Sequence, residues 1–264
     1  MGDSTSLIEP SALGMLWAVG LMVIAIGLAS WQRLGLAKTL TIATFRTVTQ
    51  LLFVGSVLTV IFASNQPLVV LGLLVAMTTI AAVVARGRID RDLPRLLKWV
   101  WLAIFTSGLV IMMYVSLLII QFDPWYDPRY LIPLTGIVLG NAMTAASIAG
   151  ERLVTALKNN RVEIETHLSL GATPTQAIAA YRQAAIKAGL IPTVNAMMVV
   201  GLVTLPGVIT GQLLGGASPL VAAVYQILIM FMLALATLIA SLIVSYGITR
   251  QFFNSAMQLV EPQS

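Results

Sequence analysis

Seven apolar runs dominate this sequence, and each is long enough to cross a lipid bilayer as a helix. A hydrocarbon core about 30 Å thick takes roughly 20 helical residues to cross. The runs lie near residues 12–30, 42–62, 68–85, 99–120, 131–149, 190–211 and 220–247. Charged residues make up 9% of the chain, too few to cover a soluble globule of 264 residues. The alternating pattern of barrel strands is absent, so we expect an all-α, polytopic membrane protein.

The basic residues predict how these spans are oriented. Loops rich in Lys and Arg stay on the cytosolic side of a membrane. If the N-terminus lies outside, the inner segments hold nearly all of the 15 basic residues, the outer segments hold only Arg129, and Arg46 lies within a span. We therefore predict a multi-pass protein of the cell membrane with its N-terminus outside and its C-terminus in the cytosol. The net charge of +5 then reflects topology, and no nucleic-acid partner is expected.

One inner segment, residues 150–189, is long enough to contact a soluble partner. Thr173 is suited to cap a helix, Pro174 suits the first helical position, and Gln176 completes a capping box. Gly171 suits the end of a preceding helix that we expect from about residue 151 to residue 170. The sequence thus predicts a projecting helix-turn-helix.

Polar side chains inside the spans are candidates for lining a path across the membrane, because each is costly in lipid unless it faces protein or water. Arg46 can act as a cation at the inner mouth of a path or anchor its helix at the interface. For Asn141, a hydrogen bond to another helix and a place on the path both stay open, and the same alternatives hold for Asn195, Gln212 and Gln226. The remaining candidates are Gln50, Asn195, Gln212 and Gln226.

The predicted sixth span carries features of a moving helix. Pro206 removes a backbone hydrogen bond midway along it, so we expect a kink next to Gly207. Gly207 and Gly211 are spaced so that another helix can approach closely. These residues are candidates for a gate, with static packing as the alternative.

Several chemistries are excluded by residues that the sequence lacks. It has no cysteine and one histidine, which excludes thiolate metal sites, iron–sulfur clusters and a multi-histidine cage within one chain. It also has no Gly-x4-Gly-Lys-Ser/Thr phosphate-binding motif. We expect no bound cofactor and no ATP hydrolysis by this chain, and the ligands of any transported metal stay unknown.

The helix-turn-helix resembles the coupling segment of ABC importer permeases, which seats in the ATP-hydrolysing subunit. Glu165 and Gly171 have the spacing of the Glu-Ala-Ala-x3-Gly pattern, although residues 166 and 167 are Thr-His. By this resemblance the residues expected to couple to an ATPase are Glu165, His167, Gly171, Ala172, Thr173 and Pro174.

Over nearly its whole length, the chain resembles the FetB family of ABC permeases, associated with bacterial iron export and plant aluminium tolerance. The matching pieces, in family order, are Phe45 to Gln50, Gly136 to Met143, Gly171 to Ala177, Asn195 to Gly207, Thr210 to Gly216, and Pro219 to Gln226. The resemblance implies one permease domain over residues 1–264, a homodimer, and a separate ATPase that binds ATP and Mg²⁺.

Three functions stay open on sequence alone. The first is a permease for ATP-driven export of iron or another metal ion. The second is an ABC permease for a small organic solute such as a nucleotide sugar, which the lack of Asp and Glu in the spans favours. The third is a stand-alone secondary transporter or a membrane scaffold.

Overall fold

The computed structural model describes residues 11–64, 66–121, 123–254 and 256–260, and it is built of helices. No strand occurs in these ranges, so the all-α class is confirmed. In chain order the elements are α1 (Ala12–Trp31), α2 (Ala37–Ser64), α3 (Pro67–Ile89), α4 (Leu96–Tyr114), the π-helical turn η1 (Val115–Ile119), α5 (Pro128–Asn159), α6 (Arg161–Ser169), α7 (Pro174–Ala177), α8 (Ala179–Val199), α9 (Gly207–Leu214) and α10 (Pro219–Phe252).

The described residues form two compact units. Residues 11–64 with Leu214–Gly216 form unit 1, in which α1 and α2 pack against each other. Most large apolar side chains of this unit face outward, for example Leu16, Trp17 and Phe53. The hydroxyls of Thr41 and Thr59 donate to carbonyls one turn earlier in α2, so these polar groups are satisfied within the helix. Such a surface is suited to lipid.

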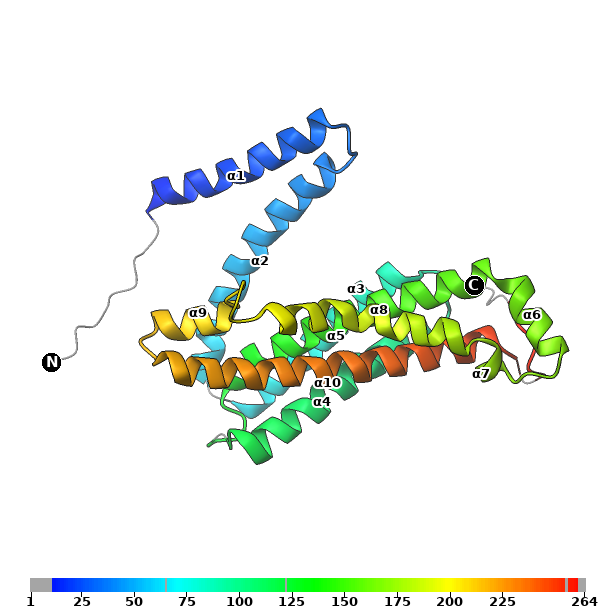
Figure 1. The fold of residues 1–264 in the computed structure, drawn as a ribbon. Coiled ribbons are helices and arrows are strands. Elements are labelled where there is room, and N and C mark those ends of the chain that lie inside the picture. Colours follow the sequence, from blue (N-terminus) through cyan, green and yellow to red (C-terminus); the bar gives the residue numbers. More distant parts are fainter. Residues whose placement is uncertain (1–10, 65, 122, 255, 261–264) are drawn as a thin grey trace. The chain divides into compact units, whose positions relative to one another are not determined.

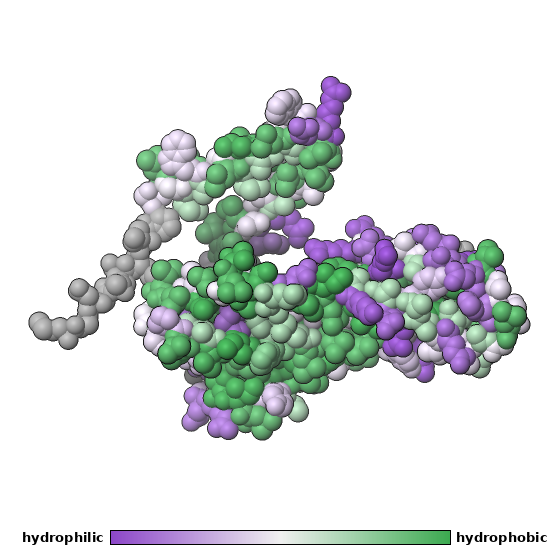
Figure 2. All heavy atoms as spheres, in the orientation of Figure 1, coloured by the Kyte–Doolittle hydropathy of each residue, from purple (hydrophilic) through white to green (hydrophobic). Residues whose placement is uncertain are grey.

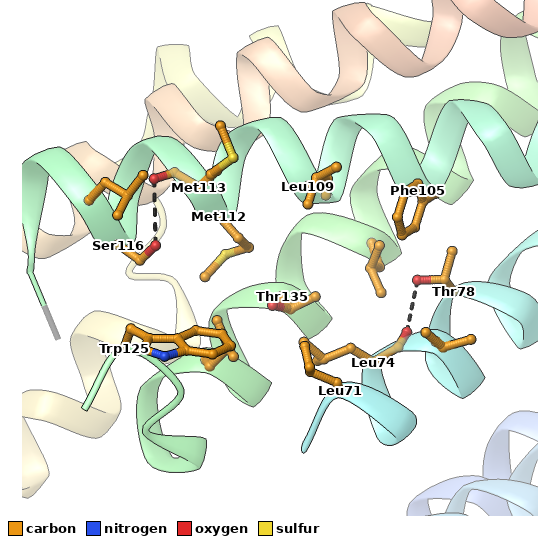
Figure 3. A pocket seen from close by; sticks show the side chains of 15 residues that line it. Leu71, Leu74, Thr78, Phe105, Leu109, Met112, Met113, Ser116, Trp125 and Thr135 are labelled. Carbon is orange, nitrogen blue, oxygen red and sulfur yellow. Dashed lines mark hydrogen bonds between the residues drawn. The ribbon is translucent and has the colours of Figure 1, made fainter. Parts of the chain in front are cut away.

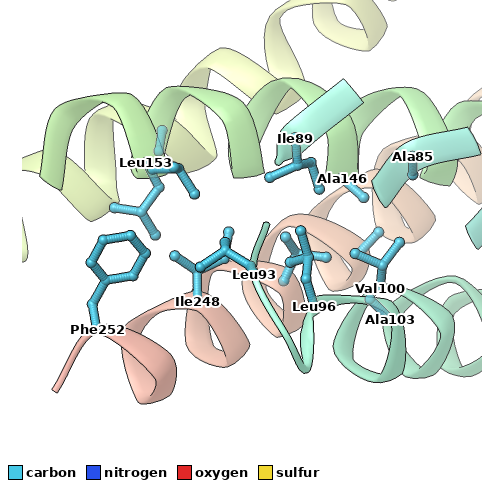
Figure 4. Packing of buried hydrophobic residues seen from close by; sticks show 14 of the residues in the cluster. Ala85, Ile89, Leu93, Leu96, Val100, Ala103, Ala146, Leu153, Ile248 and Phe252 are labelled. Atoms are coloured by element: carbon cyan, nitrogen blue, oxygen red, sulfur yellow. The ribbon is translucent and has the colours of Figure 1, made fainter. Parts of the chain in front are cut away.

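Unit 2 is a bundle of α3, α4, α5, α8 and α10. α5 packs against each of the other four, and α10 packs also against α4 and α8. Alanines such as Ala85, Ala103 and Ala146 are fully or almost fully buried between the helices (Figure 4). Small residues let helix backbones approach closely, which is how helices pack when lipid supplies no hydrophobic driving force. The same core continues through Leu153 to Phe252 near the ends of α5 and α10 (Figure 4).

Six helices in the described chain are long and apolar enough to cross a membrane, namely α1, α2, α3, α4 with η1, α5 and α10. The remaining expected span, residues 190–211, is not one helix. α8 ends at Val199 and α9 begins at Gly207, and Gly201 between them has φ +80°. The two helices follow one another along α10 (Figure 1). The kink expected at Pro206 is therefore a complete break over residues 200–206.

Two helices of unit 2 are longer than the thickness of a membrane core. α5 has 32 residues and α10 has 34, which at 1.5 Å per residue gives about 48 and 51 Å against a core of about 30 Å. The separate helix expected from residue 151 to 170 is instead the end of α5 followed by α6. On the face that Figure 2 shows, hydrophobic residues cover most of the helical bundle, whereas hydrophilic residues are frequent around α6 and α7.

Gly189 lies where α8 closely approaches both α5 and α10. A Cβ atom at this position of α8 would lie 2.8 Å from the backbone oxygen of Ala145 in α5 and 2.7 Å from the Ser241 hydroxyl in α10. Backbone cannot move aside as a flexible side chain can, so the position requires glycine. The middle of α8 is thereby packed closely against both α5 and α10.

We predict that Gly189→Ala lowers the thermal stability of the purified protein by several degrees, because overpacking costs about 1–3 kcal/mol. The matched control is Gly72→Ala in α3, where a Cβ would meet no atom within 4 Å. Melting in detergent, followed by size-exclusion chromatography, measures both. Equal melting temperatures for the two variants would contradict the close packing of α5, α8 and α10.

Candidate functional site

The break between α8 and α9 leaves non-helical backbone within the expected membrane span. The Gly201 amide donates to the Thr204 carbonyl (2.9 Å), and the amides of residues 202–204 all donate to the carbonyl of Val199. Leu202 is 87% exposed and Val203 is 80% exposed. Irregular backbone at membrane depth is tolerated only where protein or a water-filled cavity covers it. Within a membrane, this break therefore needs a water-filled cavity or further protein to cover it.

A cavity of about 380 Å³ opens beside this break. Its walls come from the end of α8, the break, α9 and the first half of α10, and its lining includes Met197, Pro206, Ile209, Gln226 and Met230. Gln226 is only 4% exposed, and its Oε1 has no hydrogen-bond partner among the described residues. An amide oxygen in such a site is available to accept a hydrogen bond from, or to coordinate, a molecule that enters.

A second cavity, of about 280 Å³, lies between α3, α4 with η1, and α5 (Figure 3). Apolar side chains dominate its lining, among them Leu109, Met112 and Trp125. Thr135 is 5% exposed, and its Oγ1 has no partner within the described chain. Thr78 also lines the cavity, but its hydroxyl donates to the Leu74 carbonyl at 2.8 Å (Figure 3).

The predicted helix-turn-helix is present, and its turn is closely specified. Gly171 has φ +91°, and it ends α6 in a Schellman motif: its amide donates to the Leu168 carbonyl and the Ala172 amide donates to the His167 carbonyl, both at 3.0 Å. The Thr173 hydroxyl then accepts from the Gln176 amide at 3.4 Å, while the Gln176 side chain accepts from the Thr173 amide at 2.9 Å. This capping box is the one that the sequence predicts.

The helices on either side of the turn bury some of their apolar side chains against the bundle and expose others. Ile164 and Ile178 are fully buried. The Glu163 carboxylate accepts a hydrogen bond from Tyr181, which raises the pKa of that phenol and ties α6 to α8. Leu170 and Val162, by contrast, are about four-fifths exposed on an otherwise polar segment. Exposed apolar side chains rimmed by polar ones are typical of a protein docking surface.

The other predicted coupling residues lie on this surface. Glu165 accepts a hydrogen bond from Arg161 Nε at 2.8 Å, and both side chains are about half exposed. The Nε2 atom of His167 lies 3.9 Å from a Glu163 carboxylate oxygen. Both contacts are between residues one turn apart in α6, so they stabilise the short helix that carries the turn.

The structure brings some predicted path residues together and separates others. Pro206 and Gln226 line the same cavity. Asn141 donates to the Ile137 carbonyl of its own helix at 2.9 Å, a bond that the two sequence alternatives did not include. Gln212, in α9, has a buried Oε1 with no partner in the described ranges. The exposed candidates are Arg46 and Gln50 on α2, Asn195 on α8, and Gly207 and Gly211 on α9.

Sequence reasoning missed Thr135, Leu170 and Val162. Thr135 was detectable as a hydroxyl in an apolar span, but most such hydroxyls bond to their own helix, as Thr78 does. The exposure of Leu170 and Val162 follows from the tertiary packing of α6. Within the described residues, no group of three or more His, Cys, Asp or Glu side chains could hold a metal ion.

We predict that Gln226→Leu makes the isolated protein more stable. Leucine has a similar volume and removes a buried polar group that lacks a partner, a defect that costs about 1–3 kcal/mol. The control is Thr237→Val in the same helix, whose hydroxyl donates to the Leu233 carbonyl at 2.8 Å and should bring no gain. Thermal melting in detergent measures both. A melting temperature for Gln226→Leu at or below that of the unaltered protein would contradict the unsatisfied state of Gln226.

Comparison with known proteins shows the family of this chain. A UPF0014 membrane protein of Synechocystis is 51% identical over 97% of this chain and 98% of its own length. The "Probable iron export permease protein FetB" of Escherichia coli is 33% identical over 93% of both chains. The "Protein ALUMINUM SENSITIVE 3" of Arabidopsis thaliana is 34% identical over 96% of this chain and 89% of its own.

No solved structure matches the chain. The model of the family described as "Uncharacterised protein family (UPF0014)" matches residues 12–253. These matches confirm the resemblance to the FetB-like permeases. The chain therefore belongs to the UPF0014 family of multi-pass membrane proteins.

Proposed function

We propose that this chain is the membrane-spanning permease subunit of an ATP-driven ABC transporter that exports iron or another metal ion. The observation that carries the proposal is the course of α8. This helix begins at Ala179, shortly after the turn at Gly171, and runs 21 residues, about 30 Å, to the break at Val200. One continuous helix thus joins a surface suited to docking a soluble subunit to the irregular part of the membrane span.

The proposed cycle uses this connection. A separate ATPase, which binds ATP and Mg²⁺, docks on α6 and the turn, with Leu170 and Val162 as apolar contacts. Its closure displaces the turn, and α8 passes the displacement to residues 200–206. Because helices of the bundle pack with small residues, they move as stiff bodies, and the break takes up the change. A second copy of the permease covers the exposed break, with the substrate path between the two copies.

The name of the Escherichia coli relative supports a metal ion as substrate. The cavity beside the break offers the Gln226 amide oxygen and thioethers from Met197 and Met230. Amide and carbonyl oxygens suit hard cations, whereas thioethers suit soft ones. A small organic solute is the second candidate, and the apolar cavity of Figure 3 with its unpartnered Thr135 hydroxyl favours it.

Reconstitution with the candidate ATPase tests the proposal. In inside-out vesicles, we expect Fe(II) to stimulate ATP hydrolysis and to accumulate in the lumen. A stable complex that neither hydrolyses ATP faster in the presence of Fe(II) or other divalent metals nor accumulates them would overturn metal export and favour an organic solute. Failure of the two proteins to form a complex would overturn the ABC assignment itself.

Gln226→Leu should abolish metal uptake while the complex stays intact.

Gly171→Leu tests the coupling turn. A side chain at φ +91° strains the backbone by about 1–2 kcal/mol and distorts the turn. We expect the variant to insert in the membrane normally but to lose substrate-stimulated ATP hydrolysis. Thr155→Leu, which adds bulk at an exposed helical position of α5 outside α6 and the turn, is the control and should keep most of the stimulation. Unaltered stimulation in Gly171→Leu would contradict the role of the turn.

A further inference from the structure

A third cavity, of about 380 Å³, lies where α7 and the start of α8 meet the end of α10. It differs from the two cavities in the membrane span because polar side chains supply much of its wall. Its lining residues are Pro174, Thr175, Arg182, Tyr246, Thr249, Arg250, Phe253 and Asn254. No carboxylate is among them.

Two arginines give this cavity its charge. The Arg182 Nε atom is buried and has no hydrogen-bond partner in the part of the chain that the structure describes. The Arg250 guanidinium lies 5.0 Å from the centre of the Tyr246 ring, a cation–π contact that orients the side chain without neutralising it. Neither arginine forms an ion pair with any described residue. Two uncompensated positive charges therefore share one concave site.

The chemistry of this pair selects an oxyanion. Burying a guanidinium N–H without an acceptor is unfavourable, and a phosphate supplies several acceptors and a negative charge at once. The planar guanidinium group matches the spacing of phosphate oxygens better than a lysine ammonium does. The Thr175 hydroxyl is a further donor in the wall of the cavity.

The position of the cavity along the bundle indicates the source of the phosphate. Tyr246 contacts Trp99 edge to face, with ring centres 5.5 Å apart, and Trp99 lies in the first turn of the membrane helix α4. The basic segment from Arg86 to Arg95 directly precedes α4. Aromatic and basic residues gather in this way at the level of lipid head groups, and basic pockets between helices there bind anionic head groups.

We propose that this cavity binds a phosphate group through Arg182 and Arg250, with an anionic phospholipid head group as its source. Pro174 and Thr175 belong to α7, directly after the turn at Gly171. A phosphate in the cavity thus bridges the turn and α8 to α10. This proposal rests on the charge and geometry of the cavity, so it does not depend on the proposed transport function.

Native mass spectrometry of the purified protein tests the site with two probes. One arm uses phosphatidylglycerol against phosphatidylcholine, and the other uses inorganic phosphate with phosphatidylcholine as the sole lipid. We expect the unaltered protein to retain phosphatidylglycerol. In Arg182→Gln, Arg250→Gln the affinity should fall roughly 30-fold, about fivefold for each cationic side chain. Binding of inorganic phosphate alone, lost in the same variant, would support the phosphate site with a soluble source.

The control variant is Arg152→Gln, Lys187→Gln, which removes two positive charges at exposed positions outside both the cavity and the basic segment before α4. It should retain phosphatidylglycerol as the unaltered protein does. A third variant, Arg182→Lys, Arg250→Lys, keeps the charge and should bind with intermediate affinity. The proposal is overturned if the Gln variant and its control lose the lipid equally, or if the unaltered protein binds neither probe.

Discussion

Backbone amides and carbonyls at membrane depth need hydrogen-bond partners, and this requirement shapes the whole molecule. Continuous helices meet it in α3, α4, α5 and α10, and side-chain hydroxyls within them donate to carbonyls of their own helix. Residues 200–206 do not meet it in the same way, since their amides bond within a tight turn, three of them to the single carbonyl of Val199 and that of Gly201 to Thr204. The proposed path lies at this break because water or a second chain must satisfy the backbone there.

The close packing of unit 2 fixes the position of α8, the helix that leads to the break. Gly189, packed on Ala145 and Ser241, fixes α8 to its neighbours along its middle. The Schellman motif at Gly171 and the capping box at Thr173 define the other end of the connection. Because close-packed interiors deform little, we expect α8 to pass a displacement of the turn on to the break and not to bend. The exposed surface of α6 and the break are the two places where the proposed partners would bind.

The fold class and the turn at Gly171 could be predicted from the sequence. The apolar runs gave the all-α class because membrane helices are specified by length and hydropathy, and the capping residues specified the turn because caps act over three or four residues. The break at residues 200–206 was expected only as a kink, since Pro206 marks where a helix weakens but not how far it unwinds. Whether the side-chain oxygens of Gln226 and Thr135 find hydrogen-bond partners depends on packing between helices, which the local sequence pattern does not specify. The cavity at Arg182 and Arg250 joins residues far apart in the sequence, and it was not predicted.

The most direct test of this account follows residues 200–206 while the ATPase partner works. The chain has no cysteine, so Val203→Cys introduces a single thiol at an 80% exposed position of the break. Its rate of modification by a water-soluble thiol reagent is measured in the reconstituted complex, first without nucleotide and then with ATP under non-hydrolysing conditions. We expect the rate to change roughly tenfold between the two states, because the break takes up the movement of α8, and we expect this change to be lost when Gly171→Leu is added. Equal rates in both states, in a complex that transports its substrate, would contradict it.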